Sequence, residues 1–215
     1  MSAISPPIKT LADLLEQLGD IAPDRIRFHP APGTATTRDV LAVMENENVL
    51  CELVQGVLVE KAMGYRESGL AAFLIELLGA FVRSRNLGIV TAPDGTMEIM
   101  PALVRIPDVA FTRWDRLPGR RCPDDPIPAI APNLAVEVLS RSNTRGEMRA
   151  KRLDYFTAGV ELVWEIDPVS RQVTVYTSVS DAVTLTNVDL LDGGTVLPGF
   201  SLPLGELFGE LDRHG

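Results

Sequence analysis

Apolar residues recur along the chain with two different periods, and this alternation predicts helices packed on a buried sheet. The helical period is clearest over residues 66–85, where large apolar side chains follow the i, i+3, i+4 spacing. Short apolar runs at 134–139 and 160–177 are typical of strands. A second helix is expected from about Arg145 to Ala158, because the glycine that follows suits the position after a helix end.

Turn signals divide the remaining apolar runs into pairs of short strands. A Gln-Gly pair in the middle of residues 49–61 predicts a β-hairpin, and an Asp-Gly pair within 88–100 predicts a tight turn or a second hairpin. Residues 104–113 form the next expected strand, in which Pro107 favours a bulge, an edge or a strand start. Strict alternation in residues 172–177 predicts a half-exposed edge strand.

Two segments outside these runs define the expected domain organisation. Residues 1–45 have helical spacing broken by prolines, and we interpret them as an N-terminal helical extension of a domain that spans 46–215. Residues 115–132 are rich in Pro, Arg and Asp and are expected to be a loop between two neighbouring strands of a sheet. Short strands and turns and a last short helix are expected over 183–211.

Composition narrows the class of protein. The chain has 215 residues, of which 46% are hydrophobic, enough for one domain with a real core. Its net charge of −9 argues against broad electrostatic adhesion to nucleic acid, although a local basic groove is compatible with it. Two cysteines, the lack of a signal-peptide pattern and the lack of a long apolar span predict a cytoplasmic protein that does not enter the membrane.

Two acids placed inside apolar runs are the candidates for chemistry. Asp108 follows Ile-Pro in one expected strand, and Glu137 lies in the middle of another. A buried carboxylate costs several kcal/mol unless it is paired, hydrogen-bonded or bound to a metal, so two of them call for a shared cation. Mg²⁺, or Mn²⁺ in its place, would suit these carboxylates together with the backbone carbonyl of Val138. Lys151 lies one helical turn from Met148 and Tyr155 and can point inward to orient a water.

Several motifs together resemble the Uma family of restriction-endonuclease-like proteins, within the PD-(D/E)XK nuclease superfamily. The resemblance covers roughly residues 49–208 and rests on five segments, namely Glu52–Gly56, Arg105–Phe111, Leu134–Ser140, Lys151–Tyr155 and Gly159–Pro168. It implies a restriction-endonuclease-like α/β core with a mixed β-sheet flanked by helices, here with extra β-hairpins, together with Mg²⁺ dependence and often a homodimer.

Carried over residue by residue, the resemblance makes Asp108 the acid of the Pro-Asp motif and Glu137 the second acid. The superfamily's usual lysine stands two residues after the second acid, where this chain has Leu139, and the resemblance suggests that Lys151 on the next helix replaces it. Glu52 or Glu67 could be a further acid near the metal, and Glu52 is preferred because it lies in a matched motif.

The resulting hypothesis is a Mg²⁺-dependent endonuclease that hydrolyses DNA phosphodiester bonds. Two alternatives stay open, namely a catalytically inactive binding or accessory protein on the same fold and a purely structural ion pair between Glu137 and Lys151. A serine or cysteine hydrolase and a zinc site are disfavoured by the scarcity of histidine and the absence of a Gly-x-Ser-x-Gly motif. The candidates for phosphate contacts are Arg116, Arg120, Arg121, Arg145, Arg149 and Arg152.

Overall fold

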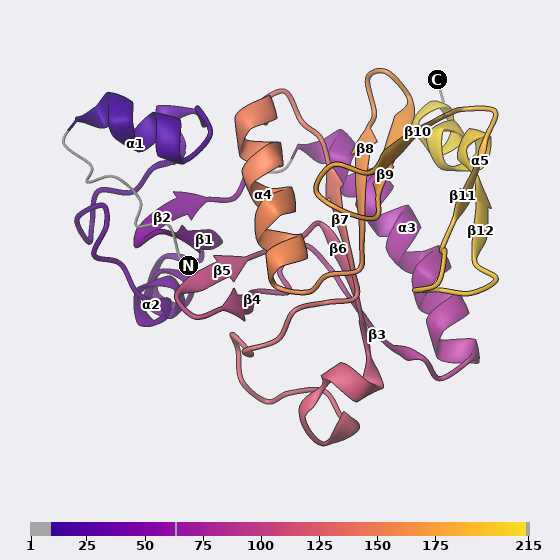
Figure 1. Ribbon diagram of the computed structural model, residues 1–215, viewed down its shortest axis with the longest axis horizontal. Helices are drawn as coiled ribbons and strands as arrows, with labels where there is room; N and C mark the ends of the chain where they lie inside the picture. The colour runs from indigo at the N-terminus through magenta and orange to yellow at the C-terminus, as the bar shows by residue number, and fades with distance from the viewer. Residues whose placement is uncertain (1–9, 63, 214–215) are drawn as a thin grey trace.

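The computed structural model describes residues 10–62 and 64–213 and places two β-sheets on either side of helix α4 (Figure 1). A four-stranded antiparallel sheet has the order β2-β1-β5-β4, and a six-stranded sheet has the order β10-β9-β8-β7-β6-β3. The first sheet consists of β1 (Cys51–Val54), β2 (Val57–Glu60), β4 (Met97–Met100) and β5 (Leu103–Arg105). The second consists of β3 (Gly88–Thr91), β6 (Val109–Arg113), β7 (Leu134–Val138), β8 (Leu162–Asp167), β9 (Gln172–Tyr176) and β10 (Ala182–Thr186).

The six-stranded sheet is mixed. Strands β7 and β8 run parallel, and every other neighbouring pair is antiparallel. Helix α4 (Arg145–Thr157) connects the two parallel strands, as a parallel pair requires. The mixed sheet flanked by helices confirms the expected fold class.

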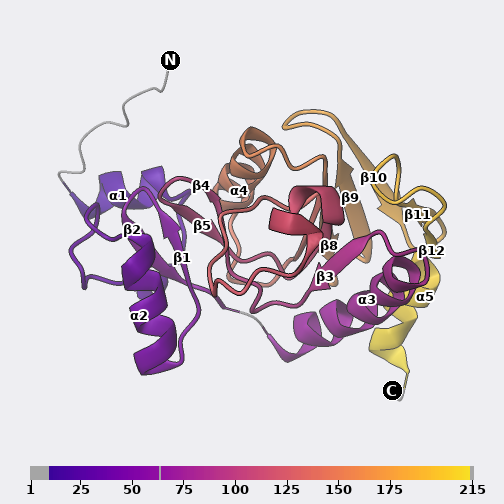
Figure 2. The same cartoon turned by 90° about the horizontal axis from the view of Figure 1, so that it is seen from below.

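One face of the six-stranded sheet is covered by the long helix α3 (Tyr65–Ser84), the hairpin of β11 (Leu190–Asp192) and β12 (Ser201–Pro203), and helix α5 (Leu204–Gly209) (Figure 2). Alternate strand residues such as Phe111, Leu134 and Trp164 pack here against Leu70 and Leu74 of α3. Every second residue of these strands therefore points into the main apolar core.

The intervening residues of these strands point to the other face of the sheet, toward α4 and the four-stranded sheet. Ala110 and Ala135 from the large sheet share a core with Tyr155 of α4 and with Val57 and Val59 of β2. Small alanine side chains allow the helix to approach the strands closely. The side chains of the candidate site on these strands point to this same face.

The first two α-helices of the described chain pack on the four-stranded sheet. Helix α1 (Leu11–Gln17) begins with the capping box of Thr10, and α2 (Thr37–Glu47) covers the outer face of β1 through Val40 and Val43. Short 3-10 helices lie at Pro23–Arg25, Trp114–Arg116, Pro118–Arg120 and Glu210–Asp212. Within the described part of the chain, no helix is long and apolar enough to cross a bilayer.

Of the two alternatives for residues 88–100, the tight turn is confirmed and the hairpin is not, and the edge strand expected at 172–177 is wrong. The tight turn within 88–100 is present, because the Gly95 amide bonds to the Ala92 carbonyl, but β3 and β4 belong to different sheets and form no hairpin. The chain crosses from one sheet to the other at this turn. Strand β9 is not an edge strand either, because β10 pairs along its whole length. Its alternating pattern comes from a sheet whose outer end is only partly covered.

Residues 104–113 form two strands instead of one. β5 ends at Arg105 in the small sheet, and β6 begins at Val109 in the large one. Pro107 lies at the break, which agrees with the expected strand start. The break directs Asp108 toward the space between the sheets.

Candidate active site

Asp108 and Glu137 are opposed across two neighbouring strands. Val109 pairs with Val136 in the antiparallel register of β6 and β7, and continuing it by one residue places Asp108 opposite Glu137. The Asp108 amide donates to the Val136 carbonyl, so the pairing of the two strands continues to Asp108. Each residue is only 4% exposed. Side chains directly opposite each other share a face of the sheet, so the two carboxylates point toward α4 together.

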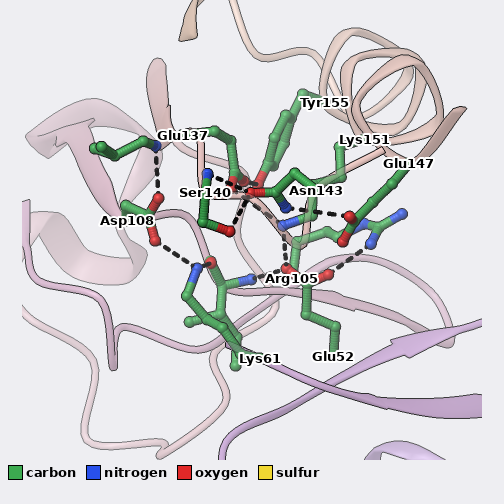
Figure 3. A network of polar contacts seen from close by, with 12 residues as sticks. Glu52, Lys61, Arg105, Asp108, Glu137, Ser140, Asn143, Glu147, Lys151 and Tyr155 are labelled. Carbon is green, nitrogen blue, oxygen red and sulfur yellow. Dashed lines mark hydrogen bonds and ion pairs between the residues drawn. The ribbon is translucent and has the colours of Figure 1, made fainter. Parts of the chain in front are cut away.

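Helix α4 brings a cation and a hydroxyl group to Glu137. The Lys151 Nζ lies 3.1 Å from one oxygen of Glu137, and the Tyr155 hydroxyl donates to the other. Lys151 is 3% exposed. The two residues are four apart and lie on the same side of the helix, whose N-terminus is capped by the Thr144 hydroxyl. Glu137 is thus held at both oxygens by one helix (Figure 3).

The four-stranded sheet adds an acid and an arginine. Glu52 of β1 lies 3.0 Å from the Lys151 Nζ, and its second oxygen lies 2.7 Å from the Arg105 guanidinium. The Ile106 amide also donates to Glu52. Arg105 forms a further ion pair with Asp154 of α4. The chain of contacts therefore ties β1, β5, α4 and β7 together across the gap between the sheets.

Asp108 has a separate cation. The Lys61 Nζ lies 2.8 Å from its Oδ1 and also donates to the Ile106 carbonyl, while the Val138 amide donates to Oδ2 at 2.6 Å. The side chain of Lys61 is 6% exposed. Figure 3 shows Lys61 reaching Asp108 from the side opposite to α4. Glu52, Asp108 and Glu137 thus each contact an internal cation.

The pKa values of the two acids that contact Lys151 are shifted in opposite directions. Burial works to raise the pKa of Glu52, but Lys151 and Arg105 outweigh it and hold that pKa well below its ordinary value. Burial raises the pKa of Glu137, and Lys151 and Lys61 offset this only in part, because the negative charges of Asp108 and Glu52 also raise it. Burial also works to lower the pKa of Lys151, yet Glu137 and Glu52 hold it above its ordinary value. Lys151 is therefore a permanent cation at neutral pH.

The other predicted residues lie apart from this network or contact it differently. Glu67 curls over Gly64 at the start of its own helix, and no described hydrogen bond or ion pair joins it to the network. Val138 contacts Asp108 through its amide, so the predicted role of its carbonyl stays a prediction. Glu52 is the extra acid that the structure brings to Lys151.

The predicted arginines divide into two groups. Arg116 lies beyond the far end of β6 and donates to the Pro132 and Gly159 carbonyls and to Glu161. Arg120 and Arg121 follow it in the same loop. The three on α4 lie nearer the site: Arg145 and Arg149 are exposed, and Arg152 pairs with Glu165 at 2.6 Å.

Sequence reasoning does not find two cations of the network. The hairpin pattern includes Lys61 only as its last residue, and Arg105 enters only within a motif. A signal for both existed in the strand parity: Lys61 alternates with Val57 and Val59, and Arg105 with Leu103, so each shares the inward face.

Two cavities lie near the network, and only the first is lined by its residues. One of about 730 Å³ lies between α1, the β1–β2 hairpin and α4, and Glu52, Arg105, Glu147 and Asp154 form its charged wall. A second of about 500 Å³ begins at the loop after β7 and is lined by Arg145 and Arg152, among others. The first cavity therefore gives solvent a route to the edge of the buried charges.

The donor set fits a hard divalent cation. Asp108 and Glu137 offer carboxylate oxygens from adjacent strands, the ligand type that Mg²⁺ prefers. Within the described residues, no three His, Cys, Asp or Glu side chains are grouped so that they alone could hold a metal. The two-carboxylate set expected from the sequence is compatible with this, because Mg²⁺ usually retains several waters.

Comparisons with known proteins agree with this architecture. A family model described as "Putative restriction endonuclease" (Uma2) matches residues 38–205. A crystal structure of "a putative nuclease belonging to DUF820 from Anabaena variabilis ATCC 29413" is similar, with a TM-score of 0.68 and 20% sequence identity over 76% of this chain and 92% of the other. At that identity the structure supports the fold alone. No curated protein matched the chain. Since the family model covers more than half of the sequence, the chain belongs to the Uma2 family.

Proposed function

We propose that this protein is a Mg²⁺-dependent endonuclease that hydrolyses phosphodiester bonds in DNA. The observation that carries the proposal is the pair of opposed buried carboxylates, Asp108 and Glu137, with the Lys151 ammonium 3.1 Å from one of them. The description of the family supports a nuclease. Mn²⁺ is expected to replace Mg²⁺, because both accept hard oxygen ligands.

Each residue of the network has a definable role in this reaction. Asp108, Glu137 and the Val138 carbonyl would hold the ion. When bound, Mg²⁺ polarises the phosphate and lowers the pKa of a coordinated water. Tyr155 keeps Glu137 oriented by donating to its second oxygen. Lys151, which stays protonated, orients the attacking water and stabilises negative charge that develops on the phosphate oxygens.

Arginines near the site could contact substrate phosphates. Arg145 and Arg152 line the cavity of about 500 Å³ that begins at the loop after β7, together with Glu165, which is bound to Arg152, and Asp167. Arg145 is exposed and has no described carboxylate partner, so its charge is available to a phosphate. Because the chain as a whole is acidic, this local group of arginines must supply most of the attraction for the nucleic acid backbone.

Cleavage of supercoiled plasmid tests the proposal. We expect Mg²⁺- or Mn²⁺-dependent nicking that EDTA stops and that Asp108→Asn and Glu137→Gln both abolish. Arg171→Gln is the matched control, because it removes a charge from an exposed ion pair with Asp212. Undiminished cleavage in Asp108→Asn would contradict the assignment. A single-stranded RNA assayed in parallel separates DNA from RNA as substrate, and light scattering tests the expected homodimer.

One observation favours the alternative of a catalytically inactive binding protein on this fold. The side chains of Lys61, Asp108 and Lys151 are at most 6% exposed, and every carboxylate of the network is already paired. Nucleic acid binding by the wild-type protein that Asp108→Asn leaves unchanged, without cleavage in any metal, would establish this alternative.

A further inference from the structure

Lys61 contacts the very carboxylate that the proposed metal requires. Its Nζ lies 2.8 Å from Asp108 Oδ1, whereas the other oxygen of Asp108 is bound to the Val138 amide inside the sheet. Oδ1 is therefore the oxygen of Asp108 that remains for an external cation. An ammonium in contact with it repels a dication that approaches the same oxygen.

Resting on the proposed function, we propose that Lys61 is an internal counter-ion that competes with the divalent metal for Asp108. In the metal-free protein Lys61 compensates the buried carboxylate and holds it in place. When the ion binds, the ammonium withdraws from Oδ1. Lys61 is thus a positioning residue that sets the affinity of the site for metal.

The local structure allows the side chain of Lys61 to move while its backbone stays fixed. The Lys61 amide bonds to the Leu50 carbonyl, which extends the ladder of β1 and β2 by one step. The ammonium has no second acid among its described contacts, since its other partner is the Ile106 carbonyl. Lys151, by contrast, contacts both Glu52 and Glu137, so its withdrawal would remove the cation from two buried acids at once. Of the two lysines, Lys61 is the exchangeable one.

Charge can be separated from shape by two substitutions at this position. Lys61→Gln keeps a donor for Asp108 and Ile106 but removes the positive charge. Lys61→Arg keeps the charge. Calorimetric titration of Mn²⁺ into the metal-free full chain gives the affinity of each variant, with Arg171→Gln as a control for loss of net charge from an exposed pair. Circular dichroism reports whether each variant is folded.

We expect Lys61→Gln to bind Mn²⁺ about tenfold or more tightly than the wild type, because the unit charge that repels the dication is gone. Lys61→Arg and Arg171→Gln should stay within about threefold of it, since neither removes charge from the site. A purely structural role for Lys61 would instead weaken binding in the Gln variant. If that variant is unfolded in EDTA, Mn²⁺ should refold it, because the metal supplies the missing positive charge.

The outcomes separate this inference from the proposed function. Equal or weaker binding in Lys61→Gln, with binding in the wild type, overturns the competition and leaves the nuclease proposal intact. A failure of Mn²⁺ to refold an unfolded variant also overturns it. Binding in neither protein overturns the competition, and the plasmid assay then decides separately whether the nuclease proposal stands.

Discussion

Replacing Lys151 by methionine removes one charge from the centre of the network while preserving most of the side-chain volume. The ammonium lies 3.0 Å from Glu52 and 3.1 Å from Glu137. After the substitution Glu52 keeps Arg105 and the Ile106 amide, but Glu137 keeps only the Tyr155 hydroxyl among its described side-chain contacts. The variant therefore leaves one buried carboxylate without a cation in contact with it, and only the more distant charge of Lys61 still acts on it.

Loss of one partner from a buried ion pair costs about 3–5 kcal/mol. For a chain of this length, each kcal/mol corresponds to about 2–4 °C in melting temperature, so Lys151→Met should melt about 6–20 °C below the wild type. The double variant Lys151→Met/Glu137→Gln should recover at least about 2 kcal/mol, because it also removes the uncompensated charge. The defect of the single variant should shrink as the pH falls, since burial already raises the pKa of Glu137 and protonation removes its charge.

Urea unfolding in EDTA at neutral pH, followed by circular dichroism, measures these free energies without interference from metal. The matched control is Arg171→Met, whose partner Asp212 lies at 2.6 Å on the surface with 55% of its side chain exposed. That pair should be worth about 0–1 kcal/mol. A loss below about 1 kcal/mol in Lys151→Met, or a double variant less stable than the single one, would refute the view that Lys151 compensates Glu137.

Two further substitutions test the partners of this lysine. Glu52→Gln should lower stability at pH 7, because the folded protein holds the pKa of Glu52 well below the 4.5 of a free carboxyl. The difference from the wild type should shrink as the pH falls below about 4.5, because the unfolded chain then takes up a proton that the folded protein does not. Urea unfolding at pH 7 and pH 3 measures both differences. Tyr155→Phe should cost about 1–3 kcal/mol by leaving an oxygen of Glu137 without its donor, and a change below about 0.5 kcal/mol in the same assay would show that this hydrogen bond is unimportant.

The sequence was sufficient to predict how the two acids would come together. Apolar runs around Asp108 and Glu137 marked two buried strands, and the acids occupied positions whose neighbours belonged to the core. Pro107 marked the place where one strand ends and the next begins. The inward direction of Lys151 followed from its spacing to Met148 on the helix. Local periodicity carries this information because strand and helix repeats are fixed by backbone geometry.

The pairing of strands was harder to predict, and the errors have a common cause. The Asp-Gly turn after β3 resembles a hairpin turn, yet the strands on its two sides belong to different sheets. A turn motif specifies the local path of the backbone and not the partner of the strand that follows it. Arg105 was missed for a related reason, since its contact with Glu52 joins residues 53 positions apart. Such pairs exist only once both sheets are assembled.

The choice between lysine and arginine is a sequence signal that would have identified Lys61. The chain has 20 basic residues, of which only three are lysines, at positions 9, 61 and 151. Two of the three lie in one buried network, each against an acid proposed for catalysis. Arginine binds carboxylates through a planar fork, whereas lysine is a compact charge on a flexible stem. A site that must exchange an internal cation for a metal favours the second kind of charge, so a rare lysine at the inward end of a strand is itself evidence for a place in that site.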